Sequence, residues 1–281
     1  MREMKLPDII PVVICFGLVF WLYTAVFHNW YVTWMAKESE YTHAFLVPFI
    51  SLFIMWLRRK DLADARVEPS IMGLQYLIPS LLVFVVMTWA GATSPQGLFF
   101  PVLIWGLVLM LLGPHVAKIV KFPVAYLFFM CTLPGDILTK VTFRIQMIST
   151  TGATALLNLF GLQAEQSGQF ISLPGITVEV AAPCSGFRML ISLFAFSVLF
   201  AYLKEGPLWG RLTLVAITLP LSIVLNSLRI MMVAVVGDYW GSEAMHSFHD
   251  YSGYMVLAMA FVILPLLARL LKCPNFNSTL V

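Results

Sequence analysis

The apolar residues of this chain form long runs separated by short polar stretches. A helix needs about 20 residues to cross a hydrocarbon core of about 30 Å. Runs that approach this length occur at residues 8–27, 43–57, 71–90, 97–113, 120–134, 186–203, 211–236 and 252–271, although the second and the fifth are short. The pattern therefore predicts an all-α polytopic membrane protein with about eight transmembrane helices.

The one long connection between these runs covers residues 134–183. Its first part, residues 136–162, has apolar positions at helical spacing, with Lys140 and Arg144 on the polar side. This spacing predicts an amphipathic helix at the outer membrane interface, and a buried ninth helix is the alternative. Gly161 is expected to end the helix.

Two short runs with alternating polarity follow, at Gln169–Leu173 and Ile176–Val180, on either side of Pro174 and Gly175. They predict a small β-hairpin on the outer face. Its edges would be unsatisfied in hydrocarbon, so it must lie in water or against protein. We expect residues 1–281 to form a single integral membrane domain, with the interfacial helix and hairpin (136–183) as a small outer cap.

Composition agrees with this class, because 60% of the residues are hydrophobic, 11% are charged and the mean hydropathy is +0.89. Soluble domains carry about 25% charged residues, so a soluble enzyme, a disordered protein and a nucleic-acid-binding module are excluded. The four cysteines lie far apart without a C-x-x-C pair, at Cys15, Cys131, Cys184 and Cys273. We therefore expect no disulfide framework, no metal site and no cofactor.

The distribution of Lys and Arg predicts the orientation of the chain in the membrane. With a cytoplasmic N-terminus, twelve of the 17 basic residues fall on the cytoplasmic side. Basic residues favour that side, so both termini are expected to be cytoplasmic. The five outer basic residues are then Lys37, Lys140, Arg144, Arg188 and Arg229.

Cys184 follows Pro183 and opens the sixth predicted span. A thiol at a helix N-terminus is stabilised as the thiolate by the helix dipole and the free N–H groups. Arg188, one turn later, adds positive charge. The alternative is a small buried cysteine, which fits the other three.

Two further polar groups are predicted near the same depth. Arg229 lies about 27 Å of helix rise beyond Arg211 in the seventh span, with Asn226 about one turn below; a snorkelling arginine is the alternative. His246 and His249 lie at the outer mouth of the eighth span. We favour His249, which leads directly into the helix, and solvated loop histidines are the alternative.

A thiol, an imidazole and a guanidinium at one depth suit nucleophilic attack on a carbonyl. The residues that carry this chemistry also resemble motifs of the exosortase/archaeosortase family of polytopic cysteine transpeptidases. The similar segments, in the order of the family, are Glu40–Pro48, Ser167–Arg188, Asn226–Ile230 and His249–Tyr254. Ala44 and Asp250 depart from the family pattern.

The resemblance implies a catalytic set of Cys184, Arg229 and His249. Supporting or substrate-binding positions would be Arg188, Asn226, His43, Ser185 and Gly186, and His246 stays a rival for the histidine role. The implied substrates are exported proteins with a C-terminal tripartite signal: a short motif such as Pro-Glu-Pro, a hydrophobic helix and a basic cluster.

On this basis we expect a membrane-embedded cysteine protease or transpeptidase in the bacterial inner membrane, with its active site facing the exterior. It would cleave the sorting signal at the outer interface and transfer the protein to a lipid or polysaccharide acceptor. Its partners would be these exported proteins and the lipid bilayer, without nucleic acid. The alternatives are a small multi-pass transporter, a non-catalytic scaffold for envelope polysaccharide export, and a lipid-acyl transferase acting on surface glycans.

Overall fold

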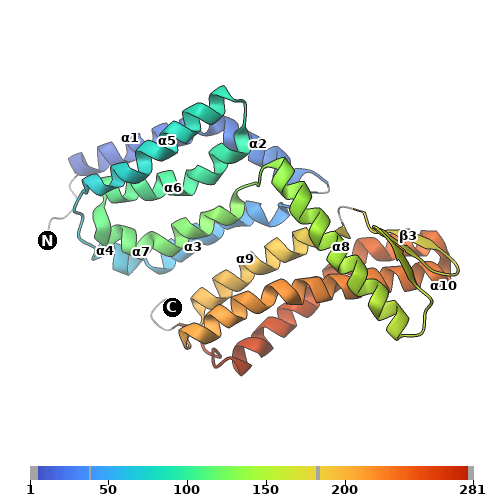
Figure 1. Cartoon of the computed structure of the whole chain (residues 1–281). Coiled ribbons are helices and arrows are strands. Elements are labelled where there is room, and N and C mark those ends of the chain that lie inside the picture. Colours follow the sequence, from blue (N-terminus) through green and yellow to red (C-terminus); the bar gives the residue numbers. More distant parts are fainter. Residues whose placement is uncertain (1–5, 38, 182–183, 278–281) are drawn as a thin grey trace. The chain divides into compact units, whose positions relative to one another are not determined.

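The computed structural model describes residues 6–37, 39–181 and 184–277, without the side chains of residues 6–9 and 93. The chain divides into two compact units, of which the first ends at Pro134 and the second begins at Gly135 (Figure 1). The single membrane domain expected from the sequence stays a prediction.

The first unit is a bundle of helices with an aromatic core. The Tyr23 ring centroid lies 4.8 Å from that of Phe84 and 5.1 Å from that of Phe100, distances typical of attractive ring contacts. The elements of this unit are α1 (Leu6–Leu22), α2 (Thr24–Met35), η1 (Thr42–Leu46), α3 (Val47–Leu57), α4 (Arg59–Ala63), η2 (Ile71–Gly73), α5 (Leu74–Trp89), α6 (Thr93–Leu111), α7 (Gly113–Tyr126) and η3 (Leu127–Met130).

The second unit is built on a helical hairpin within α10 (Leu208–Leu270). Gly241 divides α10 into two arms, residues 208–240 and 242–270, because its φ of 84° and ψ of 176° belong to a region that side chains exclude. The arms run antiparallel, since Arg229 of the first bonds Ser252 of the second. The remaining elements are α8 (Gly135–Leu159), β1 (Glu165–Ser167), β2 (Phe170–Ser172), β3 (Thr177–Glu179) and α9 (Phe187–Leu203).

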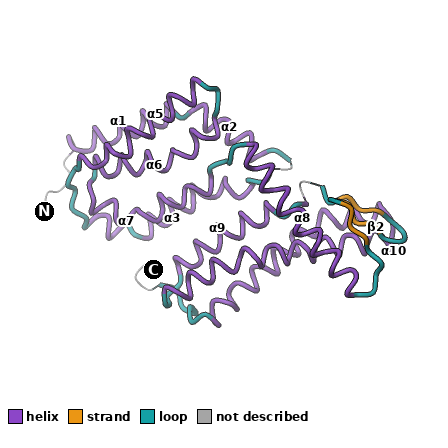
Figure 2. Tube along the Cα trace, viewed as in Figure 1, coloured by secondary structure: helices purple, strands orange, loops and turns teal. Residues whose placement is uncertain are grey.

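The hairpin predicted between residues 169 and 180 is present as β2 and β3, which pair antiparallel with Ile171 opposite Val178. A third strand, β1, was not predicted, because its sequence Glu165–Ser167 is entirely polar; it pairs with β2. The strands lie together beside α8 and α10 in the second unit (Figure 2), where Ile171 and Val178 pack with Leu157 and Ile230. Protein therefore covers one face of the sheet.

Helix α8 matches the predicted amphipathic helix, and Gly161 follows its end with a φ of 83°. Lys140 and Arg144 are exposed, as expected. The buried stripe is more polar than an interfacial helix requires, and it consists of Thr142, Gln146, Ser149, Thr150, Ala153 and Leu157. This stripe packs against protein, as in the buried alternative, since Ala153 and Leu157 contact α10 residues; a position at the membrane interface stays a prediction.

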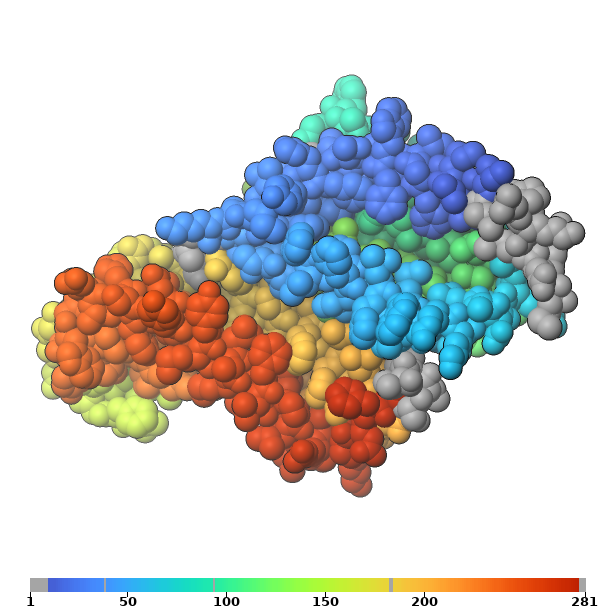
Figure 3. Space-filling model, turned by 180° about the vertical axis from the view of Figure 1, so that it is seen from behind, coloured from blue at the N-terminus to red at the C-terminus, as the bar shows by residue number. Residues whose placement is uncertain are grey.

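The C-terminal arm of α10 lies on the surface of the second unit (Figure 3). Large aromatic side chains on both sides of Gly241 are mostly exposed, namely Tyr239, Trp240, Tyr251 and Tyr254. Exposed Tyr and Trp are enriched where a membrane protein meets the headgroup region. The tip of the α10 hairpin has the composition of such an interfacial surface.

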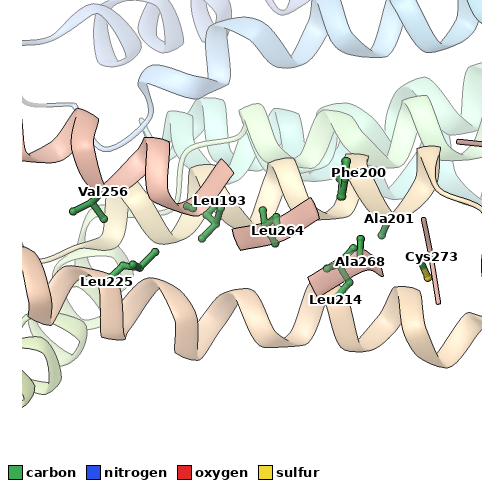
Figure 4. Packing of buried hydrophobic residues seen from close by; sticks show 10 residues of the cluster. Leu193, Phe200, Ala201, Leu214, Leu225, Val256, Leu264, Ala268 and Cys273 are labelled. Carbon is green, nitrogen blue, oxygen red and sulfur yellow. The ribbon is translucent and has the colours of Figure 1, made fainter. Parts of the chain in front are cut away.

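The core between α9 and the two arms of α10 contains leucines together with small residues such as Ala201 and Ala268 (Figure 4). Leu193 of α9 packs with Leu225 and Val256, which come from opposite arms. Further along the hairpin, Leu214 packs with Ala268. The small side chains let the helices approach closely, and this packing fixes the two arms that carry the polar residues described below.

Within the part of the chain that the structure describes, three helices are long and apolar enough to cross a membrane, and the number of spans rises to as many as five if each bent helix pair forms one span. The chain is thus a multi-pass membrane protein, but the expected eight spans are not confirmed. Two of the expected spans, residues 211–236 and 252–271, lie on the two arms of α10. Two others are the shorter apolar helices Thr42–Leu57 and Phe187–Leu203.

Candidate active site

The second unit brings together the thiol, the imidazole and the guanidinium singled out from the sequence. The Sγ of Cys184 contacts the Nε2 of His249. The Nη2 of Arg229 lies 3.2 Å from the same imidazole nitrogen. Cys184 comes from the loop before α9, whereas Arg229 and His249 lie on the two arms of α10. Three separate segments therefore meet at one nitrogen atom.

The loop that carries Cys184 is held by a buried amide. Asn226 is 1% exposed, and its Nδ2 donates to the carbonyl of Cys184 at 3.1 Å and to that of Ser185 at 3.0 Å. Gly186 has a φ of 90°, and a Cβ built there would lie 2.6 Å from the Cγ of Asn226. A glycine is thus required both for the backbone conformation and for the close approach of the amide.

Helix α9 begins at Phe187, so Cys184 precedes the helix instead of forming its first turn. The N-cap residue is Gly186, and the Oγ of buried Ser185 accepts the N–H of Phe187, the first helical residue, at 3.2 Å. The helical i, i+4 relation expected between Cys184 and Arg188 therefore does not apply. The thiol still lies on the N-terminal side of α9.

Arg229 is fixed by a residue that the sequence analysis did not single out. Its Nε donates to the Oγ of Ser252 at 3.0 Å, and Ser252 in turn donates to the carbonyl of His249 at 2.8 Å. Ser252 is completely buried. Its position three residues after His249 on a helix was the available signal, since residues at this spacing share a face.

The imidazole of His249 has a third neighbour, on its other nitrogen. Its Nδ1 lies 3.5 Å from the Oδ1 of Asp250, whose side chain is 82% exposed. With the proton on Nδ1, the ring donates to this carboxylate and presents Nε2 to the thiol; with both nitrogens protonated, it forms an ion pair with the thiolate. His246, the rival histidine, is exposed; its electrostatic interaction is with His249.

The other predicted positions lie at different distances from this centre. Arg188, in the first turn of α9, interacts electrostatically with Arg229. Its Nε and Nη2 are buried without a hydrogen-bond partner among the described residues. His43 belongs to η1 in the first unit, which the structure does not place relative to the site. Across the described ranges, no group of three or more His, Cys, Asp and Glu residues suitable for a metal is present.

Chemically, this arrangement supplies a nucleophile, a proton carrier and a fixed positive charge. The imidazole is in position to accept the proton of the thiol, and the guanidinium is close enough to interact favourably with a thiolate. Among the described residues, the Nη1 of Arg229 has no hydrogen-bond partner. A donor is thus available for an oxygen of a bound molecule.

The comparisons with known proteins place the chain in a family. The family model described as transmembrane exosortase matches residues 30–266, which include every residue of the site. Neither a curated protein nor a solved structure gives a significant match. Because the match covers well over half of the sequence, the chain belongs to the transmembrane exosortase family.

Proposed function

We propose that this protein is a cysteine transpeptidase of the bacterial inner membrane. It cleaves the C-terminal sorting signal of exported proteins at the outer interface and transfers them to a lipid or polysaccharide acceptor at the cell surface. The observation that carries the proposal is the contact of the Cys184 thiol with the His249 imidazole beside the guanidinium of Arg229.

In the first step, His249 takes the proton of the thiol and the Cys184 sulfur attacks the scissile carbonyl carbon. The negative charge that develops on the carbonyl oxygen is stabilised by Arg229 through the N–H groups of Nη1. Collapse of the tetrahedral intermediate breaks the C–N bond. The protonated His249 gives its proton to the leaving amine, and the exported protein is left as a thioester on Cys184.

In the second step, the acceptor's amine or hydroxyl attacks the thioester. His249 takes the proton of the attacking group and returns it to the Cys184 sulfur as the C–S bond breaks. The thiol and the neutral imidazole are thereby restored. The C-terminal peptide, with its hydrophobic helix and basic cluster, leaves as the first product.

The length of α10 supports a site at one membrane surface. From Leu208 to Arg229 a helix rises about 32 Å, close to the thickness of a hydrocarbon core. The exposed aromatic residues around Gly241 are of the kind found at interfaces. A substrate tail that spans the bilayer with its basic end in the cytoplasm would present its motif at this level.

Substitution of the nucleophile tests the proposal. We expect Cys184→Ala and Cys184→Ser to abolish cleavage of a co-expressed exported protein that ends in the tripartite signal, as measured by the mass of its C-terminus. Cys15→Ala is the matched control, because Cys15 is a free cysteine on α1 that makes none of the contacts described for the site, and this variant should cleave normally.

The alternatives predict other results in the same experiment. A scaffold for polysaccharide export, or a transporter, retains full function without the thiol of Cys184. A lipid-acyl transferase leaves the C-terminus of the exported protein intact and adds an acyl group to a glycan, which mass spectrometry of the product identifies. Full processing by Cys184→Ala would overturn the transpeptidase proposal.

A further inference from the structure

Ser252 links two groups of the candidate site. Its Oγ accepts the Nε–H of Arg229 at 3.0 Å and donates to the carbonyl of His249 at 2.8 Å. A hydroxyl carries a single proton. Because that proton goes to the carbonyl, a lone pair of the Ser252 oxygen is directed at the guanidinium.

The effect on Arg229 is to fix the plane of its guanidinium. Ser252 holds the Nε edge, while Nη2 lies 3.2 Å from the Nε2 and 3.5 Å from the carbonyl oxygen of His249. Hydrogen bonds in several directions define the orientation of a planar group, whereas a single charge contact does not. The Nη1 group, without a partner among the described residues, is then directed away from these contacts.

We propose that Ser252 is a positioning residue for the reaction, which holds Arg229 so that Nη1 meets the developing negative charge on the substrate. This inference rests on the proposed function, and it adds a residue that acts only through Arg229. It also explains why a hydroxyl occupies a completely buried position on an apolar membrane helix.

The competing explanation is that Ser252 only satisfies its own hydroxyl within the helix, as serines commonly do. The chain contains a matched control for this. Ser222 lies on the other arm of α10, is 1% exposed, and donates to the carbonyl of Leu219 at 2.8 Å, also three residues back. Among the described residues, no arginine donates to the hydroxyl of Ser222. Ser222 therefore makes the same bond to its own helix as Ser252 does, but it does not hold an arginine.

Steady-state cleavage of a tailed substrate by the full-length protein in membranes tests the role. Misplacing a catalytic group by about 1 Å costs about 100-fold in rate, so Ser252→Ala should lower kcat by about 10- to 100-fold with KM nearly unchanged. Ser222→Ala should leave both constants unchanged, and Ser252→Thr, which keeps the hydroxyl, should retain more activity than Ser252→Ala. Equal effects of Ser222→Ala and Ser252→Ala would overturn the inference.

A double-mutant cycle tests whether Ser252 acts through Arg229. A lysine side chain lacks the Nε–H group that donates to the serine. Ser252→Ala should therefore lower the cleavage rate by no more than about twofold when it is added to Arg229→Lys. Residual cleavage by the Arg229→Lys protein is followed over hours by mass spectrometry. Independent, multiplying losses would show that Ser252 acts by another route and would overturn the inference.

Two further measurements separate positioning from general damage and from failure of the proposed function. In a Cys15→Ala background, alkylation of Cys184 by iodoacetamide and the unfolding temperature should be nearly unchanged by Ser252→Ala, because the thiol and imidazole stay in place. A parallel loss of both would indicate disruption of the site and overturn the positioning role. If Cys184→Ala is inactive and the losses of rate multiply in the double-mutant cycle, the role of Ser252 is overturned but the proposed function stands. If Cys184→Ala is active, the proposed function is overturned together with this inference.

Discussion

Replacement of Asn226 by the isosteric Asp tests how strongly the cysteine loop depends on one buried amide. The substitution keeps the shape of the side chain. It removes the Nδ2 group of Asn226, which donates to the carbonyls of Cys184 and Ser185. At this buried position the new carboxyl is protonated and has a single O–H donor. At least one of the two carbonyl oxygens therefore loses its partner.

The magnitude follows from the lost contact. A buried polar group that loses its partner costs about 1–3 kcal/mol, so the carbonyl left unpaired costs about 2 kcal/mol. If this energy acts on the loop conformation, the population with Cys184 in place falls by about 30-fold. We expect kcat/KM for cleavage to fall at least as far, with KM little affected.

The assay compares Asn226→Asp with a control that carries the same change outside the site. Asn158 bonds the backbone of Ala164 through both ends of its amide, at 3.0 and 2.9 Å, in the loop after α8. Asn158→Asp should retain cleavage. If Asn226→Asp cleaves within about threefold of the wild type while folding normally, the amide does not hold the loop and the reasoning fails.

Three other changes test the remaining parts of the site. Gly186→Ala, at a φ of 90° with the amide of Asn226 2.6 Å from the new Cβ, should cost at least about 1–2 kcal/mol of folding stability by thermal unfolding; an unchanged stability would contradict the required close approach. His249→Ala should abolish cleavage, whereas His246→Ala should reduce it less than about threefold, because the Nε2 of His249 contacts the thiol and the side chain of His246 is exposed; the reverse order would reassign the histidine. Arg188→Gln should raise the KM for the tailed substrate more than it lowers kcat, because its Nε and Nη2 are unpaired among the described residues; an unchanged KM would remove its binding role.

The sequence was sufficient for features that a local pattern determines. Hydrophobic runs predicted the positions of most helices, and the alternating residues around Pro174 and Gly175 predicted the β2–β3 hairpin. Gly161 ended α8 as expected, since its φ of 83° is one that glycine adopts readily. The order of the cysteine, arginine and histidine motifs also identified the family.

Features that depend on tertiary packing were beyond the sequence. The polar strand Glu165–Ser167 carries no hydrophobic alternation, and it forms because β2 offers an edge to pair with. The start of α9 shifted to Phe187 because Asn226, 42 residues from Cys184, bonds the preceding loop. The bond between Ser252 and Arg229 depends on tertiary packing, because the two residues lie on different arms of α10.

The number of spans shows a different limit. A hydropathy run reports that a segment is apolar, but it does not distinguish a spanning helix from a short buried one. Thr42–Leu57 and Phe187–Leu203 are helices of this ambiguous length. The position of the break at Gly241 was also not predicted. The break needs only one residue with a positive φ, and the polar and aromatic residues around it give no clear turn signal.

The intact mass of the protein after incubation with a tailed substrate, and without an acceptor, tests directly whether Cys184 is the nucleophile. We expect an adduct on Cys184 equal in mass to the substrate lacking its C-terminal peptide, and hydroxylamine should release it as expected for a thioester. Absence of this adduct while cleavage proceeds, or its formation on a protein carrying Cys184→Ala, would contradict the central claim.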